Sequence, residues 1–188
     1  MQSGRRKLPP RQSKTNSMTA YIALLRAVNV GGTGKLPMTE LKSMCEAAGF
    51  KSVRTYIASG NVVFKAAKTE AQVKAALETA LAAYAGKPVA VMVRTAGEIA
   101  AVVAGNPFSK MPGNRTMAFF LDKAPAADAT KTVSNQTNEE IKLGLREIYG
   151  YYPDGMGTSK LKIPAAKSGT ARNMNTIAKL AEMAAGLE

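Results

Sequence analysis

The sequence predicts an α+β fold in which one subdomain packs against a second, smaller α+β subdomain. From Thr19 to Val93, strand-like apolar runs alternate with helix-like apolar spacing, and glycine or turn residues separate them. After Thr95 the pattern becomes less regular, which places the boundary there. The chain has 188 residues, of which 46% are hydrophobic, so it is long enough for one domain or two small ones with a real core.

The first subdomain, residues 18–94, contains four expected strands, over 21–28, 53–57, 62–64 and 88–93. Two helices are expected between them, because apolar residues recur there at helical spacing. The stripes are Leu41, Met44, Cys45 and Ala48 in the first helix, and Val73, Leu77, Ala80, Leu81 and Tyr84 in the second. Pro37 suits the first helical position, and Gly49 and Gly86 end the helices.

The resulting order, β-α-β-β-α-β, is that of the ferredoxin-like fold. With right-handed crossovers, the first two strands run parallel and the third lies between them in the opposite direction. The glycine loop 29–36 and the turn 58–61 should therefore emerge at the same end of the sheet. This arrangement should bring the glycine-rich backbone close to Lys35, Ser59 and Asn61 at that end of the sheet.

The second subdomain, residues 95–188, shows weaker patterns. We expect a helix over 96–104, strands over 116–121, 141–145 and 147–151, and a last helix over 176–186. Residues 105–115 and 152–157 have the composition of a loop and a turn, and 123–138 form a polar connection with room for a short helix.

Residues 1–17 form a basic tail that we expect to be disordered, because Leu8 is its one large aliphatic residue. The tail lacks the apolar stretch of a secretory signal, and Met18 is an alternative start of translation. The single cysteine, Cys45, excludes an internal disulfide, and no apolar run is long enough to span a bilayer. We therefore expect a cytoplasmic protein with no membrane partner.

The net charge of +13 comes from 26 basic and 13 acidic residues. Five of the basic residues lie in the tail, so the rest of the chain carries 21 − 13 = +8. A basic surface attracts nucleic acids, anionic lipids and phosphorylated small molecules, although solubility alone also explains it. The chain has no histidine, which excludes the Ser-His-Asp triad, the Cys-His pair and the common zinc and iron sites.

The glycine loop does not match the familiar phosphate-binding fingerprints. A Walker motif requires glycine at the position of Asn29 and serine or threonine at that of Leu36, and the dinucleotide fingerprint requires glycine where Pro37 stands. Free backbone N–H groups, Lys35 and a helix N-terminus nevertheless favour a bound anion. A plain tight loop is the alternative.

The segment 169–176 (GTARNMNT) is the other candidate for ligand binding. Arg172 offers a planar guanidinium suited to a carboxylate or phosphate. Asn173 is placed to cap the following helix, so capping and contacts between the subdomains are the alternative explanation. Tyrosines close in sequence to Lys160 and Lys162 suggest stacking on a base, but a strand with buried tyrosines explains them more simply.

Several motifs occur together in one order. They are 23–32 (ALLRAVNVGG), 55–64 (TYIASGNVVF), 106–108 (NPF), 152–155 (YPDG), 159–161 (SKL) and 169–176. In these motifs the sequence after Met18 resembles the domain of unknown function 1697 family, a group of uncharacterised bacterial cytoplasmic proteins. The resemblance implies two α+β subdomains, the first ferredoxin-like. It transfers no catalytic residue and no cofactor, because the family has no established activity.

The recurring polar positions of the family correspond to ten residues of this chain, which we take as candidates for ligand binding. They are Arg26, Asn29, Lys35, Ser59, Asn61, Ser159, Lys160, Arg172, Asn173 and Asn175. Met174 departs from the family, which usually has an aromatic residue, often tryptophan, at this position. If that aromatic stacks on a ligand in the family, Met174 weakens the expectation of a ligand here.

These observations predict a polar cleft between the subdomains that binds an anionic small molecule bearing a phosphate or a nucleotide. No metal site is predicted, and whether a reaction follows binding stays open. One alternative is a nucleic-acid-binding module that uses the basic surface, although Tyr21, Tyr56 and Phe64 are the only aromatic residues of the first four strands. The other alternative is a structural partner protein with a broad apolar patch.

Overall fold

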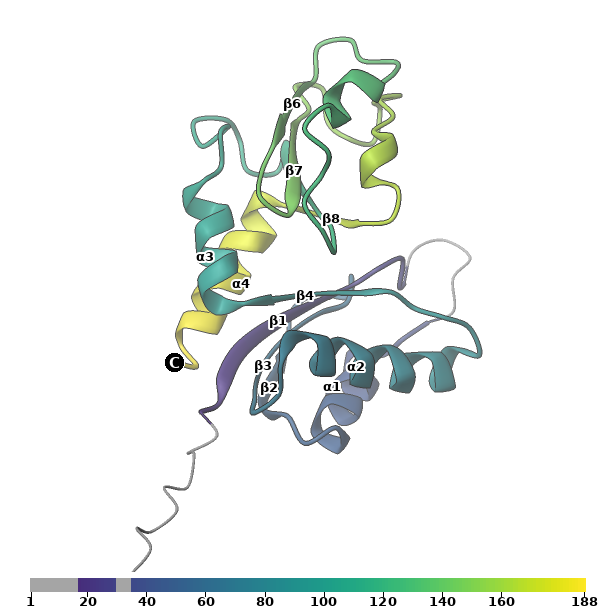
Figure 1. Ribbon diagram of the computed structural model, residues 1–188, viewed down its shortest axis with the longest axis vertical. Coiled ribbons are helices and arrows are strands. Elements are labelled where there is room, and N and C mark those ends of the chain that lie inside the picture. Colours follow the sequence, from purple (N-terminus) through teal and green to yellow (C-terminus); the bar gives the residue numbers. More distant parts are fainter. Residues whose placement is uncertain (1–16, 30–34) are drawn as a thin grey trace, which may run out of the picture.

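The computed structural model describes residues 17–29 and 35–188, so most of the basic tail and of the glycine loop lie outside the described residues. The first subdomain contains β1 (Thr19–Leu25), α1 (Met38–Ala47), β2 (Lys51–Thr55), β3 (Asn61–Ala66), α2 (Glu70–Ala85) and β4 (Val91–Thr95) (Figure 1). The order β-α-β-β-α-β is the one expected from the sequence.

The strands of the first subdomain form one antiparallel sheet in the order β2-β3-β1-β4. β3 lies between β2 and β1 and runs opposite to both, as predicted. The side chain of Asn29 donates hydrogen bonds to the carbonyl oxygens of Leu36 and Ala58, both at 2.8 Å. These bonds bring the two ends of the glycine loop to the 58–61 turn, and the ferredoxin-like arrangement is confirmed.

The second subdomain also contains a four-stranded antiparallel sheet, with the order β6-β7-β5-β8. Its elements are α3 (Ala96–Ala104), β5 (Thr116–Phe120), the 3-10 helix η1 (Ala129–Thr132), β6 (Glu140–Leu143), β7 (Glu147–Tyr151), the 3-10 helix η2 (Pro164–Ala166), β8 (Thr170–Asn173) and α4 (Met174–Ala185). The sequence does not predict β8, because this strand is short and its buried residues, Thr170 and Arg172, are polar.

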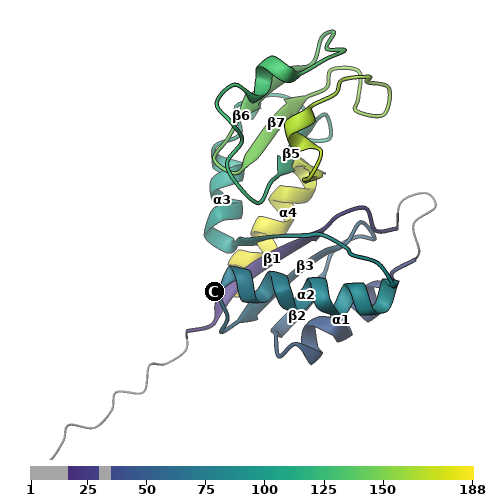
Figure 2. The same cartoon turned by 45° about the vertical axis from the view of Figure 1, so that its right-hand side comes forward.

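Helices cover both faces of the first sheet (Figures 1 and 2). α1 and α2 pack on one face around a cluster of buried residues that includes Leu25, Leu41 and Leu77. Cys45 belongs to the same cluster, and burial raises the pKa of its thiol to about 12. α3 and α4 pack against each other on the opposite face, and α4 also contacts β5 and β8 of the second sheet.

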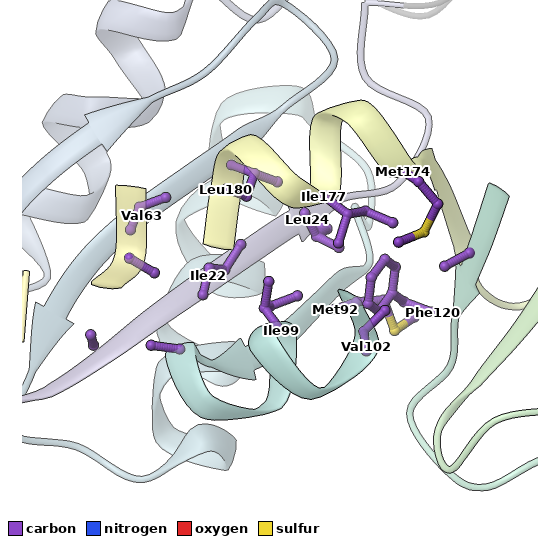
Figure 3. Packing of buried hydrophobic residues seen from close by; sticks show 14 of the residues in the cluster. Ile22, Leu24, Val63, Met92, Ile99, Val102, Phe120, Met174, Ile177 and Leu180 are labelled. Carbon is purple, nitrogen blue, oxygen red and sulfur yellow. The ribbon is translucent and has the colours of Figure 1, made fainter. Parts of the chain in front are cut away.

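A second hydrophobic cluster joins the two sheets through α3 and α4. Figure 3 shows Ile22 and Leu24 of β1 beside Ile99 of α3, Phe120 of β5 and Ile177 of α4. Each fully buried aliphatic or aromatic side chain of this kind stabilises a fold by roughly 1.5–3 kcal/mol. The two subdomains therefore share one core, which continues across the boundary that the sequence pattern suggests.

Capping residues explain where the helices begin. Thr69 and Thr95 each start a capping box before α2 and α3. Asn173 caps α4 by accepting a hydrogen bond from the N–H of Thr176 at 2.9 Å, which confirms its expected capping role. Pro37 stands one position before α1 with extended backbone angles, rather than at the first helical position.

A third cluster covers the outer face of the second sheet. Phe119, Ile148 and Tyr152 form its buried part, and residues of the η2 region pack against them. Of the helices in the described part of the chain, none has both the length and the apolar character needed to cross a membrane.

Candidate functional site

Arg172 of β8 lies between the two subdomains and is only 8% exposed. Its Nε donates to Oδ1 of Asn61 at 2.5 Å, and its Nη2 donates to the carbonyl oxygens of Leu25 at 2.8 Å and Ser59 at 2.9 Å. Its Nη1 donates two further bonds within β8. The five N–H groups of the guanidinium are therefore all in use, and they tie β8 to the end of β1.

Every hydrogen-bond acceptor around Arg172 is neutral. Burial lowers the pKa of Arg172 to about 10, which still leaves the guanidinium charged at neutral pH. Neither aspartate nor glutamate occurs in residues 17–39, 47–69 or 155–181, the segments that contain the end of β1, the 58–61 turn and β8. Buried charges in proteins usually have a partner of opposite sign, so this arrangement is unusual.

Asn61, which is fully buried, holds the 58–61 turn in place. Its Nδ2 donates to the carbonyl oxygen of Tyr56 and to Oγ of Ser59, both at 2.9 Å. Gly60 has a φ of +81°, and a Cβ atom there would lie 2.5 Å from Cγ2 of Val28, so this turn requires glycine. The structure thus brings Ser59 and Asn61 to Arg172.

Two exposed cations stand at the rim of this region. Arg26 directly follows β1, and its Nη2 donates to the carbonyl oxygen of Lys167 at 2.6 Å. Both side chains are exposed to solvent. Lys167 precedes β8 in the chain. The Arg26 bond therefore links the end of β1 to the segment before Arg172, in addition to the bond between Arg172 and Leu25.

Lys35 is exposed and lines a different pocket, on the α2 side of the first sheet. This pocket has a volume of about 420 Å³, and Tyr84 and Lys87 lie on its wall. Asn29 connects the two regions through its bonds to Leu36 and Ala58.

Asn173 and Asn175 lie at the start of α4. Asn173 is the capping residue, and the side chain of Asn175 lies directly over Gly113, in the loop that follows α3. Both therefore have structural contacts that explain them.

Ser159 and Lys160 lie elsewhere, in the loops of the second subdomain. They line a polar pocket of about 400 Å³ together with Glu139 and Asp154. Hydrogen bonds from the Ser159 hydroxyl and the Thr137 N–H lower the pKa of Glu139 to about 2. Ser159 bonds to Glu139 and Leu161, and over residues 17–29 and 35–188 no hydrogen bond connects Ser159 or Lys160 with Arg172. In the same part of the chain, no group of cysteine, aspartate and glutamate side chains could hold a metal ion.

Sequence reasoning missed Arg94, which is 2% exposed near the end of β4. Its Nη2 donates to the carbonyl oxygens of Leu121 at 2.6 Å and Arg146 at 2.9 Å, both in the second subdomain. Its guanidinium carbon lies 5.6 Å from the centre of the Phe120 ring. The signal in the sequence was a single charged residue within an apolar strand, VMVRT.

Acidic residues surround Arg94, in contrast to Arg172. Arg146 forms ion pairs with Glu70 at 2.6 Å and with Glu98 at 3.2 Å. Burial and the charge of Arg146 lower the pKa of Arg94, whereas Glu98, Glu70 and Glu147 act in the opposite direction. A cavity of about 580 Å³ lies beside these groups, between α3 and the turn that joins β6 to β7.

These features define a class of α+β proteins with two antiparallel sheets, joined by two helices and by one buried arginine from each sheet. The model of the family described as "Protein of unknown function (DUF1697)" matches residues 18–149, and the chain belongs to this family. The chain is also similar to the solved structure of the conserved bacterial protein SP0830 from Streptococcus pneumoniae, with a TM-score of 0.73 and 25% sequence identity. The match covers 89% of this chain and 99% of that one. No curated protein sequence matches the chain.

Proposed function

We propose that the protein binds an anionic small molecule, bearing a phosphate or a nucleotide, where the end of β1, the 58–61 turn and β8 meet. We name this region the Arg172 junction, and it comprises Arg26, Ser59, Asn61, Lys167 and Arg172. The observation that carries the proposal is the buried guanidinium of Arg172, whose acceptors are all neutral. An anion at the junction supplies the missing negative charge.

The residues of the junction divide into two roles under this proposal. Arg172 and Asn61 use their polar atoms on each other and on the backbone, so they hold the turn and provide a positive potential. Arg26 and Lys167 are exposed and provide the direct contacts with the anion. Asn29 and Lys35 lie beyond the 58–61 turn and define the outer limit of the region.

The proposal concerns binding, and it assigns no reaction and no cofactor. It also places the protein in the cytoplasm, where phosphate-bearing metabolites are abundant. A nucleic acid is a less suitable ligand, because α3 and α4 cover the sheet face that RNA-binding relatives of this fold expose.

A thermal-shift experiment on the full chain tests the proposal with inorganic phosphate, pyrophosphate, AMP, ATP and a single-stranded oligonucleotide. Arg26→Gln removes an exposed positive charge from the Arg172 junction. Lys123→Gln removes the same charge from the exposed loop after β5 and serves as the matched control. We expect a phosphate compound to raise the Tm of the wild type and of Lys123→Gln, and to raise that of Arg26→Gln much less.

Equal stabilisation of both variants would place the anion somewhere other than the Arg172 junction and would overturn the proposal. Stabilisation by the oligonucleotide alone, with a strong dependence on salt, would favour the nucleic-acid alternative.

A further inference from the structure

The polar pocket of the second subdomain shares no residue with the Arg172 junction, and the proposed function does not use it. Two loop segments provide its walls, 135–139 directly before β6 and 152–160 directly after β7. Its volume is about 400 Å³. Small-molecule sites in proteins commonly enclose about 300–1,000 Å³, so the pocket has the size of a binding site for a small molecule.

Hydrogen bonds fix the two walls of the pocket relative to each other. Ser134 and Lys162 exchange two backbone hydrogen bonds, of 3.1 and 2.9 Å, where the two segments come together. Within the pocket, the Ser159 hydroxyl of one wall donates to the Glu139 carboxylate of the other. The walls are therefore arranged before a ligand enters, which lowers the ordering cost of binding.

Glu139 is a buried carboxylate in the wall of the pocket, with 6% of its surface exposed. Its Oε1 accepts the bond from Ser159, and its Oε2 accepts bonds from the N–H and the hydroxyl of Thr137 at 2.7 and 3.1 Å. These bonds keep the carboxylate ionised at neutral pH. A carboxylate has about four acceptor positions, so Glu139 can accept one further hydrogen bond.

Tyr152 contributes a polar group that the protein itself does not satisfy. Its side chain is only 3% exposed, and its hydroxyl forms no hydrogen bond in the part of the chain that the structure describes. In that part, every fully buried side-chain nitrogen or oxygen atom has a partner, so the hydroxyl must reach open space. The pocket is the space that Tyr152 lines. Burial and the charge of Glu139 raise the pKa of Tyr152 to about 12, so its hydroxyl keeps its proton.

The rim of the pocket adds one free acceptor and one free donor. Oδ2 of Asp154 accepts a hydrogen bond from Asn138 at 2.8 Å, whereas its Oδ1 accepts none from the described residues. Lys160 is exposed, and its ammonium group has neither a hydrogen bond nor an ion pair over residues 17–29 and 35–188. The pocket therefore combines two donors, Tyr152 and Lys160, with two acceptors, Glu139 and Asp154.

We propose that this pocket binds a polyhydroxylated ligand of the sugar class, with one ligand hydroxyl between Tyr152 and Glu139. A hydroxyl oxygen both accepts and donates hydrogen bonds, so one such group accepts from the phenol and donates to the carboxylate. An ammonium group has no acceptor for Tyr152. A carboxylate or phosphate has no proton for Glu139, whose charge also repels it. A second ligand hydroxyl donates to Oδ1 of Asp154 and accepts from Lys160.

The first experiment compares ligand classes on the full chain by saturation-transfer difference NMR titration. The sugars are D-glucose, D-galactose, D-mannose and D-ribose. Methylammonium represents a simple cation, and glycine represents a compact molecule with both charges. We expect at least one sugar to bind and neither methylammonium nor glycine to do so.

Tyr152→Phe removes only the hydroxyl group that has no partner in the protein. Tyr151→Phe is the matched control, because it removes the same group from the neighbouring residue, whose ring packs beside Phe108 and does not line the pocket. We expect Tyr152→Phe to bind the sugar roughly tenfold more weakly than Tyr151→Phe, as for the loss of one hydrogen bond. The Tm of both variants without ligand should stay close to that of the wild type.

A second pair of variants tests the rim. Asp154→Asn replaces an acceptor oxygen by an amide donor, and Asp128→Asn makes the same change at the exposed residue before η1. We expect sugar binding to weaken severalfold in Asp154→Asn and to stay unchanged in Asp128→Asn. This pair decides the question if Tyr152→Phe does not fold.

Equal sugar binding by Tyr152→Phe and Tyr151→Phe would overturn the proposal, as would equal binding by Asp154→Asn and Asp128→Asn. Binding of methylammonium or glycine in place of the sugars would assign the pocket to another class of ligand and would overturn it too. The same holds if no compound of the panel binds. None of these results bears on the Arg172 junction, which the Arg26→Gln variant tests separately.

Discussion

Arg172 illustrates how one side chain can act as a structural tether and as a source of charge at the same time. Its guanidinium donates hydrogen bonds to the carbonyl oxygens of Leu25 and Ser59 and to the side chain of Asn61. A methionine of similar length would fill the space but would donate nothing. The buried Oδ1 of Asn61 would lose the donor that Arg172 supplies, and the carbonyl oxygens of Leu25 and Ser59 would each lose one hydrogen bond. A group that water cannot reach costs roughly 1–3 kcal/mol when it loses its partner.

Arg172→Met should therefore lower the free energy of unfolding by roughly 2–4 kcal/mol, measured by urea denaturation. Arg172→Lys should lower it less, because the ammonium group keeps three donors. Arg54→Met is the matched control, since Arg54 is exposed on β2 and its replacement should change the stability by no more than about 0.5 kcal/mol. An Arg172→Met protein as stable as this control would show that the tether contributes nothing to folding.

Glu139 should make the stability of the folded protein depend on pH in the acidic range. Its pKa of about 2 in the folded protein, set first by the Ser159 hydroxyl, lies below the value of about 4.3 expected in the unfolded chain. The unfolded state therefore binds the proton first as the pH falls, so the stabilisation is present above about pH 4.3 and is lost toward pH 2. The Tm of the wild type should fall more steeply between these values than that of Glu139→Gln. Parallel curves for the two proteins would contradict this assignment.

At the scale of elements, the N-cap of α4 connects the second sheet to the shared core. Asn173 ends β8 and caps the helix, so one residue fixes the direction in which α4 leaves the sheet. Asn173→Ala should cost about 1 kcal/mol of stability. Asn173→Asp should cost little, because aspartate caps equally well and its charge favours the helix N-terminus.

Thermal denaturation of the two Asn173 variants measures this difference, and far-ultraviolet circular dichroism checks that α4 still forms. If the alanine and aspartate variants lost the same stability, the side chain of Asn173 would have another role than capping.

The elements that the sequence predicts best are those with a repeated pattern. α3 begins and ends where its apolar spacing and its cap indicate, at Ala96 and Ala104. β8 has no such pattern, because its buried residues are Thr170 and Arg172. It adopts a strand conformation because it pairs with β5. Short strands of this kind depend on tertiary contacts that local spacing does not encode.

The same distinction applies to the candidate site. The approach of Ser59 and Asn61 to the end of β1 follows from strand order alone, so the sequence predicts it. The separation of Ser159 and Lys160 from Arg172 depends on the path of the long loops in the second subdomain, which no periodicity fixes. The sequence does not reveal that Arg94 connects the two sheets, because the carbonyl oxygens that it contacts lie 27 and 52 residues further along the chain.

At the scale of the whole molecule, the shared core should make the two subdomains unfold together. Residues of β1, α3, β5 and α4 form one hydrophobic cluster, and two buried arginines cross between the sheets. We expect a single thermal transition in which circular dichroism and tyrosine fluorescence coincide, with a calorimetric enthalpy equal to the van't Hoff enthalpy. Two separate transitions would mean that each sheet is stable without the other.

The position of α4 also determines when this chain can finish folding during its synthesis. α4 and Leu187 complete the cluster that covers β1, yet they follow every described strand in the chain. Until they emerge from the ribosome, Ile22, Leu24 and Val63 lack the cover of α4, although β1 is made long before it. The nascent chain thus carries an apolar sheet face until α4 emerges, and we expect chaperones that bind such surfaces to protect it during that interval.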